Sequence, residues 1–171
     1  MTADRDDPRR PVLPRFFVEW RQDFEGGEDL EPLDYVDFNN GVPFVLTAQW
    51  LFCPRFVEYR GCVIRICDPR GVLADAQKKA IDGWFDHFDG DISQIEAKAN
   101  LLSLWDVFSN SDLTPYCGDL SELARSIAQC WKGLLATRFR DRPFQVEVHD
   151  DDSSYGPEVT FFTRATESSS R

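Results

Sequence analysis

The spacing of apolar residues changes twice along this chain of 171 residues, and these changes constrain its fold. From residue 16 to residue 67, apolar residues alternate with polar ones or form short dense runs, as in β-strands. Between residues 74 and 142 they recur every three or four positions, as on amphipathic helices. From residue 144 the alternation returns. This order predicts an α+β fold, with an antiparallel or mixed β-sheet, about three helices packed on one face, and a C-terminal β-hairpin.

The first half of the chain is predicted to supply most of the strands. Alternation over residues 16–20 predicts a first strand, and the dense apolar run over 43–53 predicts a central strand buried on both faces. The segment between them, 22–38, contains glycine and proline and is predicted to be mainly loop. Two further strands, over 56–60 and 62–67, are predicted to be joined by a tight turn.

Three helices are predicted in the middle of the chain. The first covers residues 74–88, and the third, which has the most regular apolar face, covers 119–142. The second is predicted over 93–108, because Ser93 and Glu96 have the spacing of a capping box. The five tryptophans of the chain all fit apolar faces, so we expect them in the core.

A C-terminal β-hairpin completes a single predicted domain. Residues 144–149 alternate in polarity, and the return strand is predicted over 158–164, after a polar turn. The first 14 residues are charged and rich in proline, so 1–14 is predicted to be a flexible N-terminal arm. Residues 166–171 are predicted to be a flexible tail, which leaves 15–165 as one α+β domain.

Composition predicts a cytoplasmic protein without a cofactor. The chain has no window of about 18 uninterrupted apolar residues and no apolar signal segment near its start, so neither a membrane span nor secretion is expected. The five cysteines lie mostly within apolar segments and are predicted to be reduced, buried side chains. Glycine-rich phosphate-binding signatures are absent from the sequence.

Negative charge is concentrated in two stretches of the chain. Residues 22–38 contain seven carboxylates and residues 145–158 contain five, with no lysine or arginine in either stretch, while the formal net charge of the whole chain is −11. Patches of one sign attract cations and repel nucleic acids and anionic membranes. We therefore expect a basic protein partner, no direct binding of nucleic acid and no membrane. We also expect the two stretches to converge in the fold.

The preferred hypothesis is a small cytoplasmic protein-interaction module of the immunity or antitoxin type. Such a bacterial inhibitor occludes the active-site groove of a basic effector such as a nuclease. Carboxylates would steer the partner, and exposed tyrosines would anchor it. The predicted partner-binding residues are Asp23, Glu28, Asp29, Glu31, Asp34, Tyr35, Asp150, Asp151, Asp152 and Tyr155.

Two alternatives remain open. A metal-assisted hydrolase could use His149, since an imidazole followed by three aspartates can bind a divalent metal or act as a general base. On a strand, however, His149 and Asp150 point to opposite faces, so no catalytic or metal-binding residue is assigned and a non-enzyme is favoured. The third hypothesis is a structural subunit of a larger assembly, which predicts an exposed apolar patch and permanent association. The sequence leaves the oligomeric state open.

Overall fold

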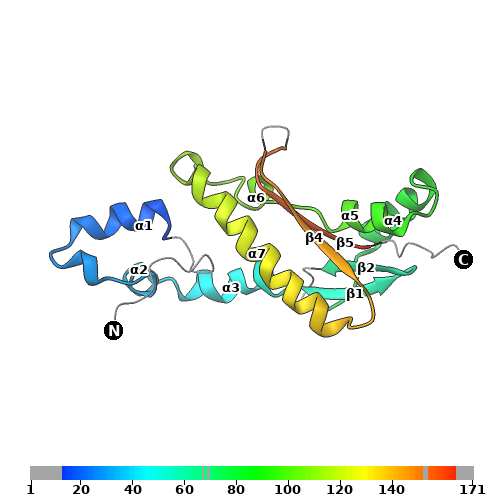
Figure 1. The fold of residues 1–171 in the computed structure, drawn as a ribbon, viewed down its shortest axis with the longest axis horizontal. Coiled ribbons are helices and arrows are strands. Elements are labelled where there is room, and N and C mark those ends of the chain that lie inside the picture. The colour runs from blue at the N-terminus through cyan, green and yellow to red at the C-terminus, as the bar shows by residue number, and fades with distance from the viewer. Residues whose placement is uncertain (1–12, 67, 69, 152–153, 165–171) are drawn as a thin grey trace, which may run out of the picture.

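A helical N-terminal lobe extends from one end of an α+β body (Figure 1). The computed structural model describes residues 13–66, 68, 70–151 and 154–164. We use "N-terminal lobe" for residues 13–52 and "body" for the described residues from 54 to 164. In chain order the elements are α1 (Arg15–Trp20), the 3-10 helices η1 (Arg21–Asp23) and η2 (Gly27–Asp29), α2 (Pro32–Phe38), α3 (Val42–Phe52), β1 (Arg55–Tyr59), β2 (Cys62–Ile66), α4 (Asp75–His87), α5 (Ile92–Ala99), β3 (Leu102–Ser103), α6 (Leu104–Val107), the 3-10 helix η3 (Thr114–Tyr116), α7 (Cys117–Arg138), β4 (Phe144–His149) and β5 (Glu158–Thr163).

The predicted α+β class and C-terminal hairpin are confirmed. β1 and β2 form a two-stranded antiparallel sheet, and the turn between them places Arg60 and Gly61 at positive φ. The second sheet is also antiparallel and has the order β3-β5-β4. β4 and β5 pair from Phe144 with Thr163 to His149 with Glu158, as expected for a hairpin. No helix in the described part of the chain has the length and apolar character of a membrane span.

The larger core lies between α7 and one face of the β4–β5 hairpin. Trp131 of α7 is fully buried, as predicted, and its ring meets that of Phe161 edge-on at 5.9 Å between centroids. Phe161 in turn contacts Phe56 of β1 at 5.4 Å, which brings the first sheet into the same core. The tryptophans do not all follow Trp131, because Trp105 is 40% exposed.

A second core packs α4 and α5 against the other face of β2. Cys62, Ile64 and Ile66 of β2 are buried with Ile81 of α4 and Ile95 of α5. Because Val63 belongs to the larger core, β2 is covered on both faces. β2 is therefore buried on both faces, the property that the sequence analysis assigned to residues 43–53, although it lies in a two-stranded sheet and is not a central strand.

Glu96 of α5 is a buried carboxylate that joins the two sheets. Its Oε1 accepts hydrogen bonds from the backbone N–H of Val63 on β2 at 2.7 Å and from Arg142 Nη2 at 2.9 Å. Its Oε2 accepts the backbone N–H of Thr163 on β5. The Glu96 carboxylate thus accepts backbone N–H groups from two strands, β2 and β5, that do not pair with each other.

Asn100, one helical turn further on, bridges the same two sheets. Its Oδ1 accepts the backbone N–H of Arg65 at 2.7 Å, and its Nδ2 donates to the carbonyls of Val63 and Phe161 at 2.9 and 3.3 Å. Like Glu96, Asn100 is buried. We call these two residues the polar bridge, because their side chains replace the backbone pairing that would otherwise link the sheets.

Residues 16–20 form α1, so the predicted first strand is wrong. Apolar residues at positions 16, 18 and 20 alternate, but the aromatic residues at 16, 17 and 20 have helical spacing, and five residues are too few to separate the two periods. Arg15 and Glu19 are one helical turn apart and form an ion pair at 2.8 Å, which adds support for the helix.

Residues 43–53 do not form the predicted buried strand either, because 42–52 form α3. A dense apolar run has no period of its own, and a length of 11 residues suits a helix better than a strand. Pro43 lies in the first turn, where a helix tolerates proline. The preceding segment, predicted as mainly loop, contains η1, η2 and α2.

The second predicted helix is shorter than expected and starts with a different cap. Asp91 accepts the backbone N–H of Gln94 at 3.1 Å and is the N-cap of α5. Ser93 instead donates to the carbonyl of Thr163, and Glu96 belongs to the polar bridge. The helix ends at Ala99, and β3 and α6 follow it.

The cysteines are less buried than predicted. Cys62 is buried on β2, whereas Cys53, Cys117 and Cys130 are exposed, and Cys67 lies outside the described residues. Nearly all of the predicted arm and tail also lies outside the described residues. The organisation of 15–165 as a single domain stays a prediction.

Candidate protein-interaction surface

The N-terminal lobe is held together by an aromatic cluster centred on Trp20. The Trp20 ring lies 4.8 Å from Phe24 and 4.9 Å from Tyr35, measured between centroids. It also contacts Phe17 at 5.7 Å and Phe38 at 5.8 Å. These contacts hold α1 against α2, because Phe17 belongs to the first helix and Tyr35 and Phe38 to the second.

Local backbone devices fold the acidic segment between the two helices. At the start of α2, Glu31 and Asp34 cap each other, and the backbone N–H of Glu31 donates to Asp34 Oδ2 at 2.7 Å. Glycine is required at position 27, because a Cβ there would lie 1.8 Å from the carbonyl oxygen of Arg21. Asp34, predicted to bind a partner, therefore also has a structural role.

Large apolar side chains on α2 and α3 are exposed to solvent. Six of them lie within fourteen residues, and each is between 54% and 75% exposed. We call this set the α2–α3 apolar surface; it consists of Leu33, Phe38, Val42, Phe44, Val45 and Leu46. Single exposed apolar residues are common on proteins, but a group of six within fourteen residues is unusual.

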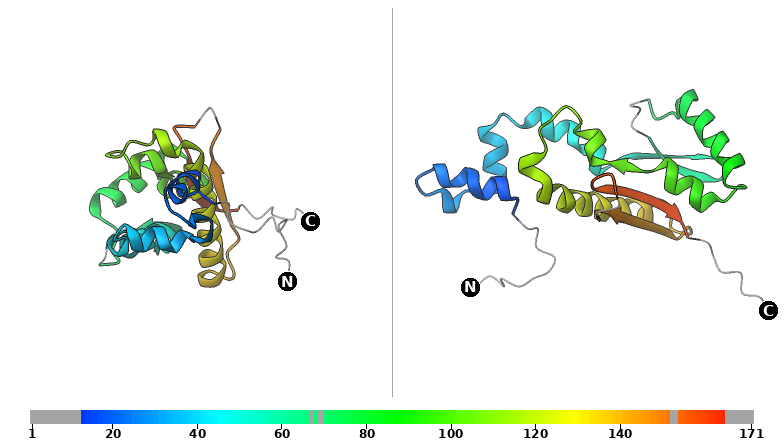
Figure 2. Two further views of the ribbon diagram at one scale, coloured as in Figure 1. Left: turned by 90° about the vertical axis from the view of Figure 1, so that its left-hand side faces the viewer. Right: turned by 90° about the horizontal axis from the view of Figure 1, so that it is seen from above.

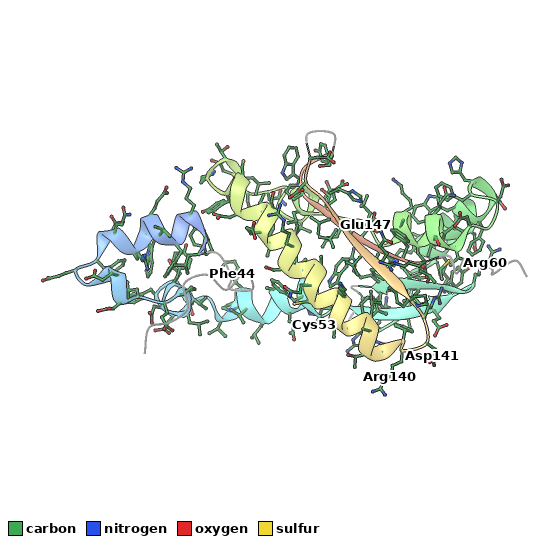
Figure 3. The ribbon with its side chains drawn as sticks, in the orientation of Figure 1. Phe44, Cys53, Arg60, Arg140, Asp141 and Glu147 are labelled. Atoms are coloured by element: carbon green, nitrogen blue, oxygen red, sulfur yellow. The ribbon has the colours of Figure 1, made fainter. Side chains whose placement is uncertain are left out.

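Among the described residues, α3 contacts the body near the C-terminal end of the helix. Leu51 and Phe52 pack against the larger core, and Trp131 Nε1 donates to the carbonyl of Leu51 at 2.7 Å. Figure 3 shows Phe44 on the first part of α3, on the side of α2, and Cys53 at the other end of the helix, beside α7. The helix therefore presents its first two turns to solvent while its last turn is anchored.

The apolar surface lies in a strongly acidic lobe. Residues 13–52 contain eight carboxylates and two arginines, which give a net charge of −6. Most of the predicted lobe residues are exposed, as expected; the exposed ones are Asp23, Glu28, Asp29 and Glu31, while Asp34 and Tyr35 are partly buried. The most exposed aromatic side chains of this region are Phe38 and Phe44 rather than Tyr35.

The second acidic stretch has partners within the protein. Asp150 forms an ion pair with Arg125 of α7, which also pairs with Glu122. Tyr155 is exposed, as predicted, and its ring lies edge-on to Trp105 at 5.1 Å between centroids. Asp151 is exposed as well, while Asp152 lies outside the described residues.

The structure does not bring the two acidic stretches together. Figure 1 shows α1 and α2 at one end of the long axis, whereas the end of β4 and the start of β5 lie near its middle. Figure 2 shows the same separation from above. The single landing site expected from the sequence is therefore divided between two places, and the lobe and the hairpin must be considered separately.

The open face of the hairpin forms an acidic cleft of about 460 Å³. Glu147 and His149 line it from β4, Glu158 from β5 and Lys98 from α5. His149 Nε2 lies 3.5 Å from Glu147 Oε2, while Asp150 turns away to α7, as strand geometry predicts. Among the described residues no group of three or more His, Cys, Asp or Glu side chains is placed to hold a metal ion. The hydrolase hypothesis thus stays a prediction without a supporting geometry.

Comparison with known proteins gives no relative. No family model, curated protein or solved structure matches the chain. Its function must be inferred from its own residues.

Sequence reasoning missed half of the α2–α3 apolar surface because it assigned Phe44, Val45 and Leu46 to a buried strand. One signal was present in the sequence. Residues 42–52 combine eleven apolar-rich positions with a proline in the first turn, which is typical of a helix, and such a helix is apolar on every side. A short helix of this kind at the edge of a protein leaves one face uncovered.

Proposed function

We propose that this protein is a protein-interaction module that binds a basic partner through its N-terminal lobe. The observation that carries this proposal is the α2–α3 apolar surface, six large side chains exposed within an acidic lobe. Apolar anchors surrounded by charges of one sign are the usual composition of a binding surface, since the anchors supply affinity and the charges steer the partner.

Charge favours a basic protein over other occupants of this surface. A second copy would bring a lobe of −6 against another of −6, and the like charges would repel each other. Nucleic acids and anionic membranes would be repelled for the same reason. A partner with apolar residues flanked by lysine and arginine would satisfy both parts of the surface.

The finer form of the proposal is inhibition by occlusion. A cationic effector such as a nuclease has a basic groove for its anionic substrate, and an acidic lobe with apolar anchors would cover such a groove. The protein would then be a cytoplasmic inhibitor of the immunity or antitoxin type. In this case the lobe carboxylates, among them Asp23, Glu28 and Asp29, would take the position of the substrate phosphates.

A model peptide can test the coarser proposal. The probe is a helical peptide of about 18 residues built from leucine and lysine, and the matched probe replaces lysine by glutamate. We expect the native protein to bind only the basic peptide. The affinity should fall steeply between about 0.05 and about 0.5 M salt.

Matched variants locate the binding site. Val45→Ser together with Phe44→Ser should weaken binding of the basic peptide by about tenfold or more, because two anchors are lost. Val72→Ser is the control, since Val72 is a similarly exposed valine on the body. Equal binding of the acidic peptide, or equal losses in the lobe and control variants, would contradict the proposal.

The same surface also favours a second candidate, a structural subunit of a larger assembly. Such a subunit uses its exposed apolar surface for permanent contacts, whereas a module exists alone before it meets its partner. Analytical ultracentrifugation of the purified protein separates the two. A monomer favours the module, and a stable oligomer that dissociates on Phe44→Ser favours the subunit.

A further inference from the structure

A pocket lies where the N-terminal lobe meets the start of α7. Its volume is about 320 Å³, within the range of small-ligand sites. The walls are largely apolar; they include Phe16 of α1, Tyr116 of η3, Leu123 of α7, and Phe108 and Leu113 from the segment before η3. The larger core forms one wall of the pocket, because Leu120 belongs to it and Phe108, Leu113 and Leu123 pack against it. The cavity itself has no occupant within the described residues.

Asp119 is the one acidic or basic side chain among the lining residues. Its Oδ1 accepts the backbone N–H of Arg15 at 2.9 Å, which ties α1 to α7. Its Oδ2 is buried and has no hydrogen-bond partner among the described residues. The guanidinium of Arg15 does not supply one, because it pairs with Glu19, and that of Arg125 pairs with Glu122 and Asp150. A buried carboxylate oxygen without a donor is rare in proteins and calls for a donor from outside.

This combination defines a chemical class of ligand. A long aliphatic chain ending in a cation would cover the apolar walls with its methylene groups and bring its positive charge to the carboxylate of Asp119, which lines the pocket. A neutral apolar group would leave Oδ2 unpaired, and an anion would be repelled. Since the other carboxylate oxygen already accepts the Arg15 amide, a single donor group such as an ammonium suffices.

We propose that this pocket accepts a lysine side chain of the basic partner. The inference rests on the proposed function for the identity of the ligand as a protein. It adds an anchoring site at the junction of lobe and body, apart from the α2–α3 apolar surface. Phe16 connects the two places, because its ring contacts Tyr35 of α2 at 5.1 Å and Tyr116 of η3 at 5.6 Å between centroids.

Two short peptides test the pocket without using the apolar surface. The probe is acetyl-leucyl-lysyl-leucine amide, and its match carries norleucine, which has the same aliphatic stem but no ammonium. We expect the lysine peptide to bind the native protein about 10- to 100-fold more tightly, as for one charge-assisted hydrogen bond. NMR titration should show the shifts at the methyl groups of Leu113 and Leu123.

Variants separate the carboxylate from the cavity. Asp119→Asn should abolish the preference for lysine over norleucine, whereas Glu122→Gln removes the same charge one turn along α7 and should preserve it. If Asp119→Asn loosens α1, Leu123→Phe provides a second test. It fills the pocket without a change of charge and should weaken both peptides equally.

Three results would overturn the inference. They are equal affinity for the lysine and norleucine peptides, an unchanged preference in Asp119→Asn, and methyl shifts confined to other parts of the protein. The proposed function fails separately, because it depends on Phe44 and Val45 and on the longer helical peptide. A second copy as the occupant would appear as peptide-sensitive dimerisation, which would also count against a lysine of a different partner.

Discussion

In the body, large apolar side chains fill two cores and the buried polar groups of Glu96 and Asn100 have partners. In the N-terminal lobe, Phe17 is the one large side chain that is buried, while residues of α2 and α3 expose most of their apolar surface. Both regions contain aromatic and aliphatic side chains. They differ in whether those residues face other parts of the same chain.

This difference shows where the packing of the protein is concentrated. The body contributes the buried residues of both cores, and the polar bridge fixes how its two sheets are joined. The lobe is held by a surface aromatic cluster, by contacts of α1 with η3 and of α3 with α7, and by the hydrogen bond from Arg15 to Asp119. Regions with few buried contacts open at low free energy, and a partner that covers them adds the missing contacts.

The largest expected effect is on the core of the body. Trp131→Ala should lower the free energy of unfolding by about 3–5 kcal/mol, because it leaves a cavity beside Phe161 and removes the hydrogen bond to Leu51. Urea denaturation followed by circular dichroism measures the loss. Phe44→Ala is the control on the lobe and should change the free energy by no more than about 0.5 kcal/mol. Similar losses in both variants would remove the distinction between body and lobe.

A smaller loss of stability is expected when the polar bridge is broken. Glu96→Gln places an amide where the carboxylate accepts two backbone N–H groups and Arg142, so one donor must face another. The free energy of unfolding should fall by about 2–3 kcal/mol. Hydrogen exchange at the amides of Val63 and Thr163 should accelerate in this variant. Unchanged exchange at both amides would show that the two sheets do not depend on this side chain.

The sequence predicted the body better than the lobe, and the reason is physical. The helix that contains Trp131 has six turns, and the hairpin strands have a clear alternation, so their periods could be read without knowledge of distant contacts. The polar bridge could not be foreseen. Ser93 and Glu96 matched a capping box, and only the neighbouring strands show that Glu96 is used elsewhere.

In the lobe the sequence signals were short or ambiguous. Residues 16–20 fit two periods, and residues 42–52 were apolar at nearly every position, so neither segment specified its structure alone. The acidic charge of the candidate site could be predicted because it is counted from the sequence and does not depend on the fold. Its apolar anchors on α3 could not, since burial was assumed for Phe44 and its neighbours. The unpaired oxygen of Asp119 likewise depends on contacts across more than a hundred residues.

The smallest expected effect is a difference in cysteine reactivity between the end of α3 and the body, and it requires no change in stability. Burial raises the pKa of the Cys62 thiol to about 11, whereas Cys53, at the junction of α3 and β1, is exposed. At pH 8, iodoacetamide should therefore modify Cys53 at least about 100-fold faster than Cys62, because the thiolate reacts and Cys62 holds little of it. Peptide mapping by mass spectrometry after timed exposure measures both rates. Rapid modification of Cys62 would mean that the body opens as readily as the lobe, and the division of the molecule into a stable part and a binding part would no longer hold.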